Sequence, residues 1–489
     1  MSLKKQLEQI AGSGNVLDDP ALKKRYAADQ SFVSGSPPAF IVRPHRVEEI
    51  QEIVRVANQT KTPLTARSSG LNLHGASVPL QGGIILDLSS MDRIIEINEQ
   101  DWYAVIEPGV TYETLQQALQ EKGLRLMAPF GVPAKRSVLT SYLERDVMLA
   151  AAHSEYGNYL IMDTELVLPE GQLFRTGCWN LDGKPGGFYG PGLNMIYKLW
   201  TGSQGTLGIF TKMVVNVQHL SPQRKFFFLP FDSTAKIPEV VKRIQRKEIG
   251  WECFGLNRFN LAALLNDEWD VPQQFPASPK PSVRFAEIQK SLPAWTLIIG
   301  LSGAPYFADE KIAYEEQALL QLCRELNFPA ATHLPGFPDL QEVFLRESLR
   351  PWGILRKFNF KGSVHDLSFK VPLRSITAVE TVVSASARHH GYPEQDIGGY
   401  FAVMERGRGI HCEFDIHCNP HNTAEQQRIK ELWLSASASL MNGGALFDRP
   451  YGDWAVLVYE RAPEYAAKLK QIKKEMDPQG ILNPGKLCF

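Results

Sequence analysis

The chain has 489 residues, of which 44% are hydrophobic and 21% are charged. This length and composition allow two or three domains with a sizeable core, and they exclude a disordered or low-complexity protein. Lysine and arginine number 52 against 53 aspartate and glutamate, so the net charge of −1 excludes a global field that would draw the chain onto nucleic acid or an anionic membrane.

Strand and helix patterns alternate from residue 39 to residue 220. Apolar residues recur at helical spacing over 50–57. Thr111 is placed to cap a second helix, which Gly123 ends. This alternation predicts α/β or α+β packing with a sheet covered on one face or both. The short apolar strand patterns of this region occupy residues 40–44, 63–66, 83–88 and 104–107.

The sequence becomes looser beyond Leu220. Five prolines between residues 272 and 293 suggest a surface insertion or a lid. Strand patterns return at 364–371 and within 400–418, and a helical pattern spans 425–441. We therefore expect a second domain in this part of the chain.

A glycine-containing loop follows the strand pattern at 63–66. From Gly70 to Ser77 it has the spacing of a phosphate loop, but Ala76 stands where the lysine is required, which argues against an NTPase. Rossmann, zincin and α/β-hydrolase signatures are missing from the sequence as well. The backbone N–H groups and polar side chains of the loop are suited to bind a diphosphate, and the alternative is a surface turn.

The ordered set of segments resembles the flavoprotein family of vanillyl-alcohol oxidase and 4-cresol dehydrogenase. The resemblance implies an α+β fold, in which a two-subdomain PCMH-type FAD-binding domain carries an α+β cap domain built on an antiparallel sheet. The expected bounds are 1–218 for the FAD-binding domain, 219–445 for the cap and 446–489 for a C-terminal return. The segments that carry the resemblance are 39–57, 67–70, 84–88, 105–112, 137–145, 165–171, 203–212 and 476–486.

FAD is the cofactor that the resemblance implies, with hydride transfer from an organic substrate to flavin N5. His365 lies before a stretch similar to the one that follows a covalent FAD tether in many relatives. It is a candidate tether, His74 is the weaker alternative, and non-covalent FAD stays open. The cofactor-binding residues implied by the resemblance are Arg67, Ser68, Ser69, Gly70, Leu71, Asn72, Ser137, Thr140, Gly205, Ile209 and Lys486.

Two departures from the family pattern bear on the site. Leu71 stands where phenol-oxidising members carry a tyrosine, so a phenolate-binding trio is incomplete. Lys135 and Arg136 stand where the family often has glycines. These two cations are either phosphate partners or exposed loop charges.

Residues 409–418 alternate with strand periodicity, which places His411, Glu413, Asp415 and His417 on one face. Such a row suits the wall of a cleft, where one of the first three side chains accepts a substrate proton. A solvated strand face is the alternative. A metal site ranks last, because one strand sets no coordination geometry.

Arg449 matches the arginine that anchors the substrate oxyanion in phenol-oxidising members of the family. A guanidinium pairs bidentately with a carboxylate or a phenolate, and Tyr451 offers a hydroxyl nearby. The alternative is that Arg449 forms an ion pair with Asp448 or Asp453.

The sequence therefore predicts an FAD-dependent oxidoreductase, either an oxidase or a dehydrogenase. The expected substrate is a small aromatic alcohol, phenolic or benzylic, or an alkylphenol-like compound. One alternative is an FAD-dependent 2-hydroxyacid dehydrogenase, with His411 and His417 beside the hydroxyl. Another is a non-catalytic or partner-docking flavoprotein subunit.

The expected acceptor of electrons is oxygen or a partner such as a cytochrome, and we expect a homo-oligomer that holds no metal. Six cysteines without a C-x-x-C pair favour reduced thiols. The N-terminus lacks an apolar h-region, and no run of about 18 apolar residues occurs. These features predict a cytoplasmic protein without a membrane span.

Overall fold

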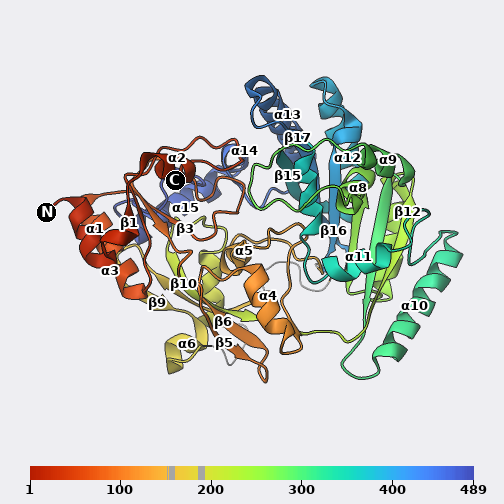
Figure 1. The fold of residues 1–489 in the computed structure, drawn as a ribbon, viewed down its shortest axis with the longest axis horizontal. Helices are drawn as coiled ribbons and strands as arrows, with labels where there is room; N and C mark the ends of the chain where they lie inside the picture. Colours follow the sequence, from red (N-terminus) through yellow and green to blue (C-terminus); the bar gives the residue numbers. More distant parts are fainter. Residues whose placement is uncertain (151, 153–159, 186–192) are drawn as a thin grey trace.

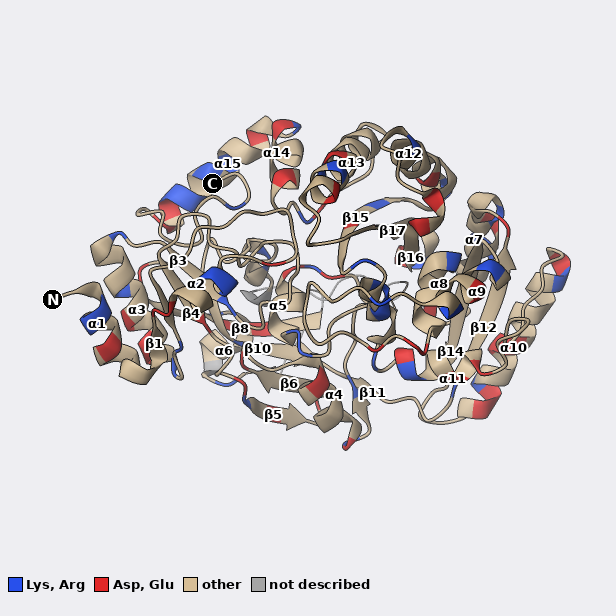
Figure 2. Ribbon diagram, turned by 45° about the horizontal axis from the view of Figure 1, so that its top comes forward, with Lys and Arg blue, Asp and Glu red and all other residues tan. Residues whose placement is uncertain are grey.

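The computed structural model describes residues 1–150, 152, 160–185 and 193–489. Figure 1 shows two lobes side by side. The first lobe combines the N-terminal part of the chain with the C-terminal helices α14 (Asp453–Glu460) and α15 (Pro463–Met476). The second lobe is built on one six-stranded sheet. Figure 2 shows Lys and Arg interspersed with Asp and Glu over both lobes, in agreement with the balanced composition.

A small sheet opens the first lobe, and two of its three strand pairings are parallel. Helices α1 (Leu3–Ala11) and α3 (Val47–Thr60) bury Leu7, Ile50 and Ile53 against it. The helix predicted over 50–57 is confirmed as part of α3. In spatial order the strands are β1 (Val16–Leu17), β2 (Phe40–Val42), β4 (Ile84–Asp87) and β3 (Leu64–Arg67).

A second, antiparallel sheet follows in the same lobe. Helix α4 (Tyr112–Gln120) packs Leu115 and Leu119 into its core, and Thr111 caps this helix as predicted, accepting a 3.2 Å hydrogen bond from the Thr114 N–H. In spatial order the strands are β5 (Ile94–Asn98), β6 (Tyr103–Ile106), β10 (Ile209–Asn216), β8 (Ile161–Val167) and β9 (Leu173–Arg175). The remaining elements of the lobe are α2 (Pro20–Tyr26), β7 (Leu124–Arg125), α5 (Val138–Leu143), α6 (Gly177–Asp182) and β11 (Gln218–His219).

The cap sheet is antiparallel throughout. The strand pattern within 400–418 forms two strands, because a turn at Glu405–Gly407 with positive φ angles reverses the chain. In spatial order the strands are β12 (Arg224–Phe231), β14 (Trp295–Ser302), β13 (Glu252–Asn257), β16 (Gly398–Met404), β17 (Gly409–Cys418) and β15 (Ser363–Pro372).

Helices cover both faces of the cap sheet. One face carries α7 (Ile237–Arg246), α10 (Ala308–Glu325), α12 (Ile376–His389) and α13 (Thr423–Asn442). The other carries α8 (Arg258–Leu265), α9 (Val283–Ser291) and α11 (Leu340–Glu347). The proline-rich stretch therefore contains a helix, α9. The apolar side chains of β17 pack on the face covered by α7, α10, α12 and α13. Its ionisable row points to the opposite face, toward α8 and the first lobe.

The C-terminal segment returns to the first lobe beside β3. Leu64 pairs with Leu482, and the Asn483 side chain donates hydrogen bonds to the carbonyls of Ala76 and Gln204 at 3.0 and 2.6 Å. The end of the chain thus holds two loops that surround the candidate site. Within the described part of the chain, no helix has both the length and the apolar character needed to cross a bilayer.

Candidate active site

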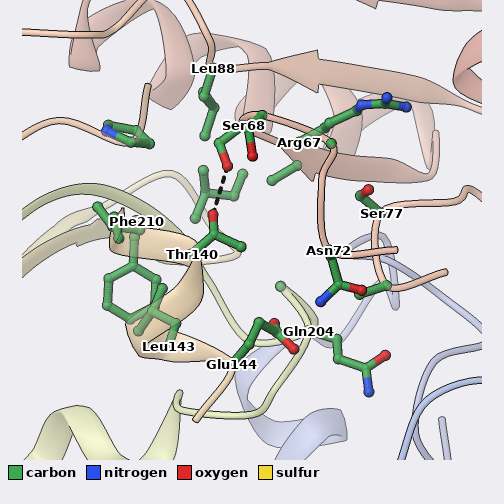
Figure 3. A pocket seen from close by; sticks show the side chains of 18 of the residues that line it. Arg67, Ser68, Asn72, Ser77, Leu88, Thr140, Leu143, Glu144, Gln204 and Phe210 are labelled. Atoms are coloured by element: carbon green, nitrogen blue, oxygen red, sulfur yellow. Dashed lines mark hydrogen bonds between the residues drawn. The ribbon is translucent and has the colours of Figure 1, made fainter. Parts of the chain in front are cut away.

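An open cavity of about 750 Å³ runs along the loop after β3. We call it the loop cavity (Figure 3). It brings together nine of the eleven residues expected at the cofactor, which come from β3 and its loop, from α5 and from the turn before β10. These nine are Arg67, Ser68, Ser69, Gly70, Leu71, Asn72, Thr140, Gly205 and Ile209.

Two hydroxyl contacts join the loop to the start of α5. The oxygens of Ser68 and Thr140 lie 2.6 Å apart (Figure 3), and Ser69 Oγ accepts a 3.1 Å hydrogen bond from the Ser137 N–H. Ser137 also caps α5, because its Oγ accepts from the Thr140 N–H at 3.2 Å. Ser137 is fully buried and supports the wall from behind.

Arg67 shapes the loop. Its guanidinium lies over the Tyr26 ring, 4.4 Å from the centroid, and points away from Ser68 and Thr140 in Figure 3. Burial lowers the pKa of Arg67. Gly70 has a φ of 67°, and a Cβ there would lie 2.3 Å from the Arg67 guanidinium, so any other residue would be strained and would displace the Arg67 side chain.

Lys486 acts on the same loop from the C-terminal segment. Its Nζ donates a 2.7 Å hydrogen bond to the Gly75 carbonyl, and burial lowers its pKa to about 8. Lys486 therefore anchors the loop, and it does not line the loop cavity.

The loop cavity fits a dinucleotide such as FAD. A Cβ built at Gly205 would meet no atom within 4 Å, so backbone there faces open space. Hydroxyl groups and backbone amides of the loop suit a diphosphate, while Leu139 and Phe210 offer apolar surface to rings. The residues present thus match the cofactor that the sequence implies.

A second cavity of about 710 Å³ lies between the first lobe and the cap sheet and shares Asn72 with the loop cavity. We call it the cap cavity. Its apolar lining includes Phe130, Val132, Val147, Leu355, Phe358 and Val364. Its polar lining includes His74, Arg136, Asp146, Lys357, Asp366, Tyr400, Glu413, Asp415 and Arg449.

Glu413 and Asp415 are the members of the β17 row that line the cap cavity. The Glu413 carboxylate lies 2.8 Å from His411 Nε2. Burial alone would raise the pKa of Glu413, but this hydrogen bond and the charges of His411, Lys357 and Arg449 outweigh it and lower the pKa. Glu413 is therefore held as a carboxylate, the form that accepts a proton.

Asp415 is held by two donors. Lys357 Nζ and Asn260 Nδ2 donate hydrogen bonds to its carboxylate at 2.7 and 2.8 Å, and its side chain is fully buried. Burial is the largest influence on Asp415 and raises its pKa. Both carboxylate oxygens thus already have partners, which leaves Glu413 as the better base.

The two histidines of the row lie away from the cap cavity lining. His417 packs between the rings of Phe259 and Phe360, and burial holds its pKa well below the ordinary value. The interpretation of this strand face as solvated is wrong, because His411 and His417 are at most 1% exposed. Among the described residues, no group of three or more His, Cys, Asp or Glu side chains has a metal-binding arrangement.

Arg449 lines the cap cavity and is anchored on both sides. Its Nη1 donates to Asp146 Oδ1 and its Nη2 to Ser368 Oγ, each at 2.6 Å. The expected alternative partners, Asp448 and Asp453, form their ion pairs with lysines instead. Arg449 is therefore paired with a carboxylate from the first lobe, 303 positions away.

Tyr451 lies behind the junction of the two cavities. Its hydroxyl donates a 2.5 Å hydrogen bond to Glu144 and accepts a 3.3 Å bond from Asn72 Nδ2. Glu144 lines the loop cavity, and burial raises its pKa. This hydrogen-bonded group connects the cofactor loop to the C-terminal return.

Both candidate tethers, His365 and His74, line a third cavity of about 420 Å³, which shares Leu73 and Asp366 with the cap cavity. The His365 ring is stacked on Phe32, with centroids 3.9 Å apart. Burial, aided by the neighbouring His74, lowers the pKa of His365 to about 3. The imidazole is therefore neutral at physiological pH.

Three residues that line the cap cavity were not predicted as site residues, because no sequence pattern around them pointed to a function. Lys357 lies in an irregular helical turn, and Asp146 has no motif around it. Tyr400 is opposite Glu413 in the β16–β17 register, so pairing the two strands would have found it. The buried Tyr400 hydroxyl has no hydrogen-bond partner among the described residues.

Comparison with protein families finds two matches. The model of the FAD binding domain matches residues 38–177, and that of the C-terminal domain of FAD linked oxidases matches residues 453–487. The first range contains the loop and the start of α5. The second contains α14, α15 and Lys486.

The chain is similar to several curated proteins. An uncharacterised FAD-linked oxidoreductase of Mycobacterium tuberculosis is 26% identical over 98% of this chain and 97% of its own length. The 4-cresol dehydrogenase flavoprotein subunit of Pseudomonas putida is 31% identical over 42% of this chain and 40% of its own length. A Danio rerio protein named as a probable mitochondrial D-lactate dehydrogenase is 26% identical over 98% and 90%.

The fold resembles that of p-cresol methylhydroxylase with substrate bound. The TM-score is 0.81 at 22% identity, over 99% of this chain and 96% of the other. This likeness confirms the predicted α+β fold class with its antiparallel cap sheet.

Proposed function

The chain belongs to the FAD-linked oxidoreductases and uses FAD, and from this premise we propose that it oxidises a small aromatic alcohol or alkylphenol-like compound in the cap cavity. The observation that carries the proposal is the junction of the two cavities at Asn72. One cavity suits the cofactor, and the other joins apolar walls to a carboxylate, Glu413. Substrate and cofactor would thus occupy adjacent cavities on either side of Asn72.

When bound, FAD would act as the two-electron oxidant and accept a hydride from the substrate carbon. The residues of the chain would supply the rest of the chemistry. Glu413 accepts the hydroxyl proton of the substrate, and His411 holds that carboxylate in place. Arg449 fixes an anionic group of the substrate, while Phe130 and Phe358 give its ring an apolar surface.

A visible spectrum tests this proposal directly. The FAD-loaded protein is mixed anaerobically with a panel of benzylic alcohols and alkylphenols, and bleaching of the flavin by some of them is expected. Yellow protein that no compound bleaches would instead favour a partner-docking subunit. Colourless protein that refuses FAD would overturn the assignment to the family itself.

A second candidate is the oxidation of a 2-hydroxy acid. It is favoured by Leu71, which leaves the phenolate trio incomplete, and by the similarity over most of the chain to the Danio rerio protein. Neither His411 nor His417 lines the cap cavity, so Glu413, which His411 holds by a hydrogen bond, would serve this reaction too. Bleaching by D-lactate-like acids and not by phenols would select this candidate.

We further propose that oxygen or an electron-accepting protein such as a cytochrome reoxidises the flavin. The support is the name of the Pseudomonas putida relative, a flavoprotein subunit. Rapid return of the absorbance when air is admitted to the reduced protein would identify an oxidase. The expected homo-oligomer and cytoplasmic location stay predictions, and light scattering tests the first.

A further inference from the structure

We infer that the cap cavity selects substrates that carry a carboxylate, and that Arg136 is the residue that makes this selection together with Arg449. The inference rests on the proposed function and narrows its substrate class. Arg136 precedes α5 and lines the cap cavity, not the loop cavity. Its position in the lining of the cap cavity therefore favours contact with the substrate over contact with the cofactor phosphates.

Arg136 is buried without being fully bonded. Its side chain is 9% exposed, and its Nη2 lies 2.7 Å from Asp146 Oδ2. That contact lacks hydrogen-bond geometry, and Nε has no hydrogen-bond partner among the described residues either. The neighbouring Lys135 is exposed. Burying a guanidinium whose hydrogen-bond donors have no acceptor lowers the stability of the fold, and a ligand that accepts those hydrogen bonds would remove this cost.

The two arginines share one carboxylate. Asp146 Oδ1 accepts from Arg449, while Asp146 Oδ2 faces Arg136 and accepts a 2.6 Å hydrogen bond from the Ser141 hydroxyl. The second partner of Arg449 is Ser368, which is neutral. This corner of the cavity therefore has two cations in direct contact with one anion.

The other nearby carboxylates are already engaged. Asp448 pairs with Lys370 at 2.5 Å, and Glu413 is bonded to His411. Glu144 accepts a hydrogen bond from Tyr451, and burial raises its pKa. A carboxylate brought by the substrate would supply the missing anion at the two arginines.

The remaining lining describes the rest of the substrate. Phe130 and Val132 lie near Arg136 in the chain, and Leu355 and Phe358 come from the cap. These walls suit an aromatic or branched apolar body. The unpartnered Tyr400 hydroxyl is a further donor for a polar substituent. The cavity is thus suited to a hydroxy acid with an apolar, aromatic side chain.

The reaction on such an acid balances. The alcohol carbon gives a hydride to bound FAD, its hydroxyl gives a proton to Glu413, and a carbonyl forms between carbon and oxygen. The carboxylate is unchanged and stays on the arginines. A 2-hydroxy acid would leave as the 2-oxo acid.

Binding of two unreactive probes tests the inference. Benzoate and benzamide have the same shape and differ in charge, and calorimetric titration of the FAD-loaded protein measures the dissociation constant of each. We expect benzoate to bind at least tenfold more tightly, because hydrogen bonds to charged groups are the strong ones. Equal affinity for the two probes would overturn the inference, even if no variant folds.

Variants then assign the selection to Arg136. Arg136→Leu should weaken benzoate binding about tenfold or more and leave benzamide binding within about twofold, and Arg136→Lys should recover part of the loss. Lys135→Leu, the exposed neighbour, is the matched control and should change neither constant. An equal loss for both probes in Arg136→Leu would reduce Arg136 to a structural residue.

The binding experiment separates this inference from the proposed function. A preference for benzoate without flavin bleaching by any hydroxyl compound would leave the inference standing and remove the proposed reaction. Bleaching by uncharged alcohols or phenols together with no preference for benzoate would do the reverse.

Discussion

Lys357 Nζ donates a 2.7 Å hydrogen bond to Asp415, and both side chains are almost completely buried beneath the cap cavity. Lys357→Met leaves the Asp415 carboxylate buried without its cation. We expect the free energy of unfolding to fall by about 3–5 kcal/mol, the usual cost of breaking a buried pair from one side. Denaturation in urea measures the change.

The matched control removes both charges. Lys357→Met combined with Asp415→Asn keeps an acceptor for Asn260 and leaves no buried charge. We expect this double variant to recover most of the lost stability. A double variant as unstable as the single one would mean that packing of the lysine stem, and not charge, accounts for the loss.

Glu413 is expected to set the rate of substrate oxidation. Glu413→Gln keeps the shape but cannot accept a proton, so anaerobic flavin bleaching should slow by about 10²–10⁴-fold while FAD stays bound. Because the pKa of Glu413 is lowered, the wild-type rate should not fall until the pH drops below the ordinary range of a glutamate. Glu405→Gln, in the turn between β16 and β17, should bleach at the wild-type rate.

Gly70 is expected to be essential for the cofactor loop. Gly70→Ala combines a positive φ with a Cβ placed 2.3 Å from the Arg67 guanidinium, so Arg67 must leave its position over Tyr26. We expect FAD affinity to fall by more than tenfold, which fluorescence titration of the apoprotein measures.

Gly183→Ala is the control for the glycine variant. Gly183 has a φ of 68°, but a Cβ there meets no atom within 4 Å. It therefore reproduces the backbone strain, about 1 kcal/mol, without the clash. Similar FAD affinities for the two alanine variants would contradict the role given to the Arg67 position.

Local patterns predicted the parts of the fold and site that depend on neighbours in the chain. Strand periodicity placed the ionisable row of β17, and the Thr111 cap followed from one residue type before a helical pattern. Glycines after β3 marked the loop that lines the loop cavity. Each of these features is determined by fewer than about ten residues, which a sequence displays directly.

Contacts between distant segments could not be predicted in the same way. The alternation of β17 gives no sign that Lys357 approaches Asp415 and leaves Glu413 as the accessible carboxylate. The pairing of Arg449 with Asp146 joins the C-terminal return to the first lobe. Only the tertiary structure brings these charges together, so local sequence could offer only the neighbouring Asp448 and Asp453 as alternative partners of Arg449.

His365 predicts a specific dependence of stability on pH. Its pKa is lowered to about 3 in the folded protein, mainly by burial, from an ordinary value of 6.5. Between these two values the unfolded chain binds one more proton than the folded chain, so the free energy of unfolding falls as the pH falls. Between pH 6.5 and about 4.5 the shifted pKa of this histidine lowers the free energy of unfolding by roughly 2–3 kcal/mol. Above neutral pH it does not change the free energy of unfolding.

His365→Phe should remove this component of the pH dependence and keep the stack on Phe32. Urea denaturation at several pH values should show that the variant loses about 2–3 kcal/mol less than the wild type over the same interval. His421→Gln, at an exposed position, should follow the wild-type curve. If His365→Phe also followed the wild-type curve, the pKa of His365 in the folded protein would have to lie near its ordinary value, and burial would not keep the ring neutral at acidic pH.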